Sequence, residues 1–108
     1  MNIVKTLESF NKDTKDSQIK ELSNFLYEKQ DYWTIQAKLF FFQLVSVELK
    51  SKGKINLNDI YQLLTNKENI AICDELLSRV ITSNSKTVRA TILTATQEPI
   101  FKLLYQGA

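Results

Sequence analysis

Hydrophobic residues recur every three or four positions along most of the chain, and short polar stretches separate these runs. This spacing places the hydrophobic side chains on one face of an α-helix. Five of the runs follow a residue that can cap the start of a helix: Asn2, Ser17, Asp31, Asn56 and Ser85. The pattern predicts helices over about residues 2–11, 17–27, 31–52, 56–66 and 68–82, and a last helical segment that begins at Ser85.

The helix predicted over residues 31–52 differs from the others because it is hydrophobic around most of its circumference. A helix of this kind is usually surrounded by the rest of the protein. Gly53 follows it and predicts a left-handed cap, since glycine adopts that backbone conformation at little cost. We expect the centre of the core to contain Trp33, Phe40, Phe41, Leu44, Ile60 and Leu64.

The last segment contains Pro99, which lacks an amide donor and clashes with the preceding helical turn. Its position predicts either a kink near Gln97 or a new helix over residues 98–105. Four threonines in this region also permit a strand, but the sequence offers no second strand to pair with it. We therefore predict an all-α fold, a single compact domain over residues 1–108 with five to six helices around a central long helix.

Composition supports this fold class. Of the 108 residues, 44% are hydrophobic and 24% are charged, as in globular domains. With two glycines and one proline, the chain has too few turn residues for an all-β fold. The most hydrophobic stretch, residues 39–47, is too short to span a bilayer, so we expect no direct membrane insertion. No signal-peptide core is visible at the start, and Cys73 is the single cysteine, so we expect a cytoplasmic location.

The residue types needed for catalysis are scarce. The chain contains no histidine, and Gly53-Lys54 lacks the other residues of a phosphate-binding loop. Asp74 and Glu75 are adjacent, so on a helix they point about 100 degrees apart and do not converge on a metal. Cys73 lies on a hydrophobic helix face and is expected to be a small buried side chain. We predict no catalytic, cofactor or metal site, and hence no enzyme.

Positively charged residues gather in two stretches of the sequence, although the net charge is only +2. The candidate partner-binding residues are Lys50, Lys52, Lys54, Arg79, Lys86 and Arg89. If they converge in space, they would attract DNA or an acidic protein and speed the encounter. If they lie on several faces, they are ordinary solvated charges.

Residues 31–106 resemble the all-α domain of type IV secretion coupling proteins, the TraD-like conjugation ATPases. In that family an aromatic residue and a tryptophan open a long helix, and an alanine follows one turn later. Tyr32, Trp33 and Ala37 match these positions. A second helix motif is matched by Leu57, Asp59, Ile60, Tyr61, Leu63, Leu64 and Thr65. A third segment is matched loosely by Lys86, Thr87, Arg89, Ala90, Ile92 and Leu93.

The resemblance implies a module that recognises protein substrates or a relaxosome component at the cytoplasmic face of the inner membrane, within a hexameric parent ATPase. DNA is a further candidate partner. This chain has no Walker A or Walker B motif, so as it stands it would bind without hydrolysing ATP. Two alternatives remain open. One is a free-standing plasmid or phage regulator that binds DNA or a partner protein as a dimer, and the other is a bundle of the bacteriocin-immunity type.

Overall fold

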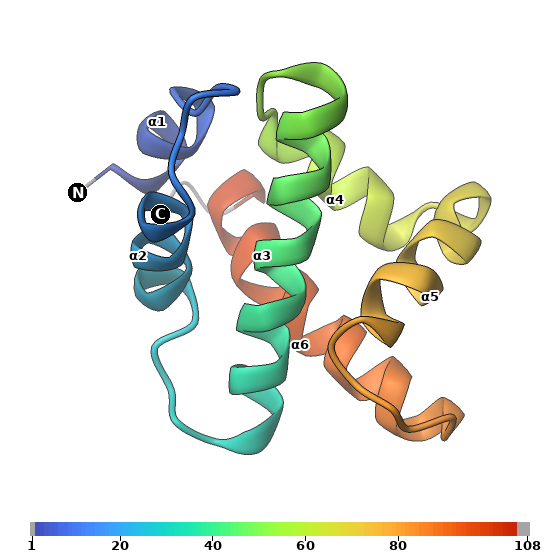
Figure 1. Ribbon diagram of the computed structural model, residues 1–108. Coiled ribbons are helices and arrows are strands. Elements are labelled where there is room, and N and C mark those ends of the chain that lie inside the picture. The colour runs from blue at the N-terminus through green and yellow to red at the C-terminus, as the bar shows by residue number, and fades with distance from the viewer. Residues whose placement is uncertain (1, 106–108) are drawn as a thin grey trace.

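The computed structural model describes residues 2–105, which form six α-helices, one turn of 3-10 helix and no strand (Figure 1). The all-α prediction is therefore confirmed. In chain order the elements are α1 (Ile3–Glu8), α2 (Asp16–Leu26), α3 (Tyr32–Lys52), α4 (Leu57–Thr65), the 3-10 turn η1 (Lys67–Asn69), α5 (Ile70–Ser78) and α6 (Lys86–Tyr105).

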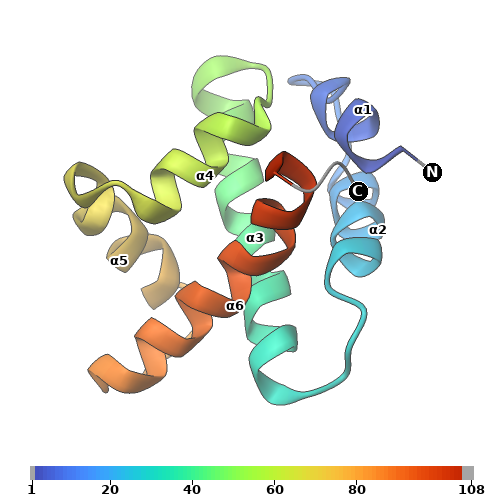
Figure 2. The ribbon, with the colours of Figure 1, turned by 180° about the vertical axis from the view of Figure 1, so that it is seen from behind.

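Helix α3 occupies the centre of the bundle. It packs against α2 on one side, α5 on the other and α6 behind it (Figures 1 and 2). Helix α4 leads from the end of α3 to α5 and packs against α6. The central position predicted for the long, largely hydrophobic helix is thus confirmed.

Most helix boundaries follow from the predicted caps. The side chains of Asn2, Asp31 and Asn56 each accept a hydrogen bond from the amide three residues later, at 2.9–3.1 Å. Ser85 does the same at the start of α6, where the Val88 amide donates to its Oγ at 3.3 Å. Gly53 ends α3 with φ at 72°, and its amide donates to the Leu49 carbonyl at 2.9 Å. Polar side chains that bind the first free amides fix where these helices begin.

Three boundaries differ from the prediction. Helix α2 begins at Asp16 rather than at a Ser17 cap, because the Lys15 amide donates to Gln18 Oε1 at 2.8 Å. The helix predicted over 68–82 is divided into the turn η1 and the shorter α5, since Asn66 caps the 3-10 turn first. Helix α1 ends at Glu8 instead of residue 11, as Asn11 pairs with Lys54 in an isolated bridge.

Pro99 does not begin a new helix at residue 98, because α6 runs without a break from Lys86 to Tyr105. Ile92, Thr96 and Ile100 lie on both sides of the proline and are fully buried on one face. The Tyr27 hydroxyl also donates to the Thr96 carbonyl at 2.6 Å. This packing outweighs the hydrogen bond that Pro99 cannot donate.

The predicted core is correct except at one residue. Phe40, Phe41, Leu44 and Ile60 are fully buried and Leu64 is nearly so, whereas Trp33 is 38% exposed. Trp33 lies in the first turn of α3, where it meets Tyr32 edge-on with their ring centroids 5.0 Å apart. It borders a shallow groove with Ala90, Thr91 and Thr94 of α6, whose short side chains leave the indole partly uncovered.

We expect Phe41→Ala to lower the free energy of unfolding by roughly 3–5 kcal/mol, since it removes a fully buried ring and leaves a cavity. Trp33→Ala is the matched aromatic control. It should cost clearly less, because the indole is already partly in water. Urea denaturation followed by circular dichroism measures both values, and equal losses would contradict this description of the core.

Tyr27 should make the protein lose stability in alkaline solution. Burial raises the pKa of its hydroxyl well above 10.0, so above that pH the unfolded chain releases the proton while the folded chain retains it. The free energy of unfolding then falls as pH rises, by up to about 1.4 kcal/mol per pH unit for this group. Burial likewise raises the pKa of Cys73 to about 11, so the two contributions must be separated.

Tyr27→Phe separates them. At neutral pH this variant should lose about 1 kcal/mol, because the hydrogen bond from the Tyr27 hydroxyl to the Thr96 carbonyl is removed. Between about pH 9 and pH 11 its stability should fall less steeply than that of the natural chain. Urea denaturation across this range tests the difference, and parallel curves would show that Tyr27 does not contribute.

Candidate functional site

A cleft with a volume of about 780 Å³ lies between α4, α5 and α6. Its floor is hydrophobic and includes Leu63, Leu64, Leu77 and Leu93. Its edge is polar and carries the charged residues Lys67, Asp74, Lys86 and Arg89. A concave hydrophobic surface with a few polar groups at its border is typical of a binding site.

Helical spacing explains how these residues reach the cleft. Arg89, Leu93 and Gln97 are each one turn apart on α6, so they share one face of that helix. Gln97 Nε2 donates to the Leu64 carbonyl at 2.9 Å and thereby joins α6 to the end of α4. Asn66 caps η1, the turn that carries Lys67 to the edge of the cleft.

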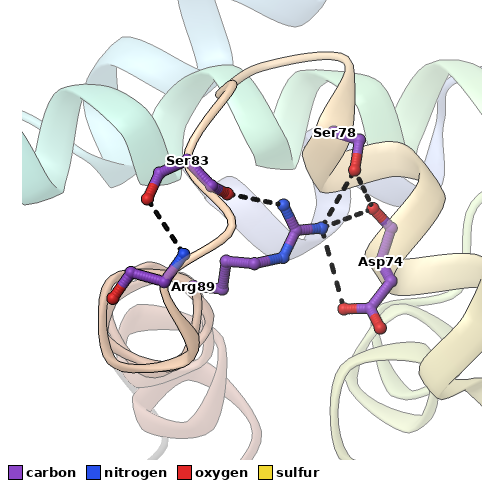
Figure 3. Close-up of polar contacts among 5 residues, drawn as sticks. Asp74, Ser78, Ser83 and Arg89 are labelled. Carbon is purple, nitrogen blue, oxygen red and sulfur yellow. Dashed lines mark hydrogen bonds and ion pairs between the residues drawn. The ribbon is translucent and has the colours of Figure 1, made fainter.

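Arg89 connects the two helices that form one side of the cleft (Figure 3). Its Nη2 donates to the Asp74 carbonyl at 2.7 Å and to Ser78 Oγ at 3.0 Å, both on α5. The Asp74 carboxylate lies 3.7 Å from the same nitrogen, and Nη1 donates to the Ser83 carbonyl at 3.2 Å. Because the guanidinium is engaged by α5 and by the following loop, Arg89 mainly fixes the shape of the cleft.

Of the six cations predicted to bind a partner, the structure brings only Lys86 and Arg89 into this cleft. Arg79 lies at another cleft and pairs with Glu75 at 3.2 Å. The segment that holds Lys50, Lys52 and Lys54 lies at the end of α3, at the opposite end of the molecule from the start of α6 (Figures 1 and 2). The six residues therefore do not form one positive surface.

The cations at the end of α3 are not equivalent. Lys52 Nζ lies 3.2 Å from Glu48 Oε2 and 3.8 Å from Asp59 Oδ2, so it joins α3 to α4. Lys50 and Lys54 are exposed, and neither forms an ion pair among residues 2–105. Lys52 thus has a structural contact of its own, whereas its two neighbours are free to interact with a partner.

Cys73 is buried, as its hydrophobic neighbours predicted. Its thiol donates to the Leu63 carbonyl at 2.6 Å, next to the floor of the cleft. Burial, with a smaller effect from the Asp74 charge, raises the thiol pKa to about 11. The thiol is therefore protonated at neutral pH, and this removes the thiolate that nucleophilic chemistry requires.

Two features of the cleft were missed in the sequence. The contact between Asp74 and Arg89, fifteen positions later, was not predicted, because it depends on how α5 packs against α6. Lys67 was not recognised because its place at the edge of the cleft depends on the 3-10 turn. The one signal present was Asn66, a residue that caps helices and begins turns.

Residues 2–105 contain no group of three or more side chains arranged to hold a metal ion. Within the same residues, no helix combines the length and hydrophobicity that crossing a membrane requires. What the cleft offers chemically is therefore a hydrophobic floor, a positive edge and hydrogen-bonding side chains.

Arg89→Lys should destabilise the protein by about 1–3 kcal/mol, although it retains the charge. A lysine ammonium cannot reach the oxygens of Asp74, Ser78 and Ser83 together, as the planar guanidinium does. Lys86→Arg, three residues away on the exposed surface, is the control and should change stability by less than about 0.5 kcal/mol. Urea denaturation compares the two variants, and a neutral Arg89→Lys would refute a structural role.

Comparison of the chain with protein-family models, curated proteins and solved structures found no match. The resemblance to the coupling-protein domain consequently depends on the sequence motifs alone. Several of the matching residues, among them Ala37, Leu57 and Ile60, are buried core positions that many helical bundles would share. Function is therefore best inferred from the cleft itself.

Proposed function

We propose that this chain is a protein-binding module without catalytic activity. The cleft between α4, α5 and α6 would receive a segment of a partner protein, with hydrophobic side chains on its floor and acidic side chains along its edge. The observation that supports this proposal is the combination of a leucine-rich floor with exposed lysines at the border. Nothing in the proposal requires a cofactor.

The hydrophobic part of the cleft favours a helical partner. A groove between helices accepts the hydrophobic face of an amphipathic helix, whose anchoring side chains recur every three or four residues. Ile70 borders the cleft and is 56% exposed, so it would add hydrophobic area if a partner covered it. The gain from covering such surface is the main stabilising term in protein association.

The charges at the edge favour a partner with acidic residues. Among residues 2–105, Lys67 and Lys86 meet no carboxylate within 4.0 Å. The one carboxylate at the border belongs to Asp74, which faces Arg89. The border therefore has unneutralised positive charge, and this would orient an acidic segment and reject a basic one.

A more specific form of the proposal is the substrate-recognition module of a type IV secretion coupling ATPase. Its support is the set of motifs at residues 32–37, 57–65 and 86–93, and the fold is compatible with it. The gene supplies the test. A Walker A motif upstream and a Walker B motif downstream in the same reading frame would support this form, and their absence would refute it.

DNA binding is the weaker alternative. The net charge is only +2, and the six candidate cations lie in three separate places: the α4–α5–α6 cleft, the end of α5 and the end of α3. Duplex DNA binding depends on many lysines and arginines that contact successive phosphates from one surface. A regulator that binds DNA as a dimer would have to assemble such a surface from two chains.

We expect a synthetic amphipathic helix, with leucines on one face and glutamates beside them, to bind this cleft. Amide shifts in the NMR spectrum should change in α4, α5 and the first half of α6. Lys67→Glu with Lys86→Glu should weaken binding by about tenfold or more, because the peptide charge is then repelled. Lys5→Glu with Lys50→Glu is the control, since it changes the net charge equally at exposed positions outside the cleft.

The proposal fails if the peptide does not bind or if its shifts lie elsewhere. Equal weakening in the two double variants would also refute it, because only the overall charge would then matter. Binding that persists when the peptide leucines become serines would show that the hydrophobic floor is not used.

A further inference from the structure

A second cleft, with a volume of about 460 Å³, lies between α2, α3 and the end of α5. Its hydrophobic part consists of Leu39 and Phe42 from α3 and Val80 from the corner after α5. Three cations surround this hydrophobic part: Lys20 from α2, Lys38 from α3 and Arg79 from the end of α5. Among the residues that the structure describes, no carboxylate lines this cleft, in contrast to the first one.

The cations around this second cleft are poorly neutralised. Within residues 2–105, neither Lys20 nor Lys38 has a carboxylate oxygen within 4.0 Å. Lys20 Nζ lies instead over the ring of Phe42, 5.6 Å from its centroid. Arg79 is about half exposed and pairs with Glu75 at 3.2 Å, so the guanidinium has room for a second acceptor.

The hydrophobic part of this cleft is also partly exposed to solvent. Leu39 is 47% exposed, although it belongs to the central helix. Lys38, Leu39 and Phe42 lie on neighbouring positions of the α3 face that neither α2 nor α5 covers completely. Covering this exposed aliphatic side chain would stabilise a complex with a partner whose negative charges face the surrounding cations.

We infer that the second cleft is a docking site for an acidic segment of a partner protein that carries one large hydrophobic side chain. That side chain inserts between Leu39 and Phe42, and flanking aspartates or glutamates pair with Lys20, Lys38 and Arg79. Charge complementarity selects this occupant, since every charged group that lines the cleft is positive. The site goes beyond the proposed function because it shares no residue with the α4–α5–α6 cleft.

Other anions fit this surface less well. A small ion such as phosphate would leave Leu39 exposed. A nucleic acid strand needs a continuous positive track along its backbone, whereas these three cations surround one hydrophobic depression. An acidic peptide with a single anchor uses both the charges and the hydrophobic floor.

The test uses a fluorescein-labelled peptide with one phenylalanine between glutamates, and the anisotropy of the full chain with the peptide is measured at low and high salt. We expect binding at low salt that weakens as salt screens the charges. Lys20→Glu with Lys38→Glu should weaken it by about tenfold or more. The matched control is Lys67→Glu with Lys86→Glu, which changes the net charge equally at the other cleft and should leave the affinity nearly unchanged.

Two further measurements isolate the hydrophobic anchor. Leu39→Ala, at an exposed position that should not disturb folding, is expected to weaken binding severalfold, and a peptide with serine in place of phenylalanine should bind as weakly. The inference is overturned if the natural chain does not bind the peptide or if the two charge-reversal variants lose affinity equally. It is also overturned if inorganic phosphate, or a single-stranded oligonucleotide, competes for the site as well as unlabelled peptide does. Failure at this cleft leaves the binding of the amphipathic helix at the other cleft unaffected, so the two proposals are tested separately.

Discussion

The whole structure depends on covering α3, a helix that is hydrophobic on nearly every side. Phe40, Phe41, Leu44 and Val45 share one broad face that spans about 140 degrees around its axis, and all four are fully buried. A face this broad is wider than one neighbouring helix covers, and α2, α5 and α6 all pack against α3. The order of the other helices in space is largely the arrangement that keeps this one helix out of water.

Both candidate binding surfaces arise from the need to cover α3. Helix α5 has only nine residues, so it covers only a short length of α3. The α4–α5–α6 cleft lies along one side of it, and the α2–α3–α5 cleft opens at its end. Arg89 holds α5 and the loop after it against α6, which keeps the first cleft in shape although so short a helix has few contacts of its own.

How much the sequence predicts depends on the range of the interaction. Asn2, Asp31, Asn56 and Gly53 act on their own neighbours in the chain, and their effects were predicted correctly. Pro99 was expected either to kink the last helix near Gln97 or to begin a new helix at residue 98. The second alternative is wrong, because buried side chains on both sides hold Pro99 within α6. Local preference is a weak constraint when tertiary packing opposes it.

The candidate sites were predicted less well for the same reason. The six cations were selected from two stretches of sequence, but proximity in sequence did not bring them together in space. Lys20 and Lys38 were overlooked because they are far from the other cations in the sequence and meet only where α2 packs against α3. The spacing of hydrophobic residues shows which face of a helix is buried, but it does not show which two helices will border a cleft.

The partial exposure of Trp33 has a consequence for spectroscopy. It is the single tryptophan of the chain, so emission excited at the red edge of the aromatic band comes from the first turn of α3 alone. The indole borders neither the α4–α5–α6 cleft nor the α2–α3–α5 cleft. Its fluorescence therefore follows unfolding of the start of α3, and ligands at either cleft can be titrated without direct contact with this built-in fluorophore.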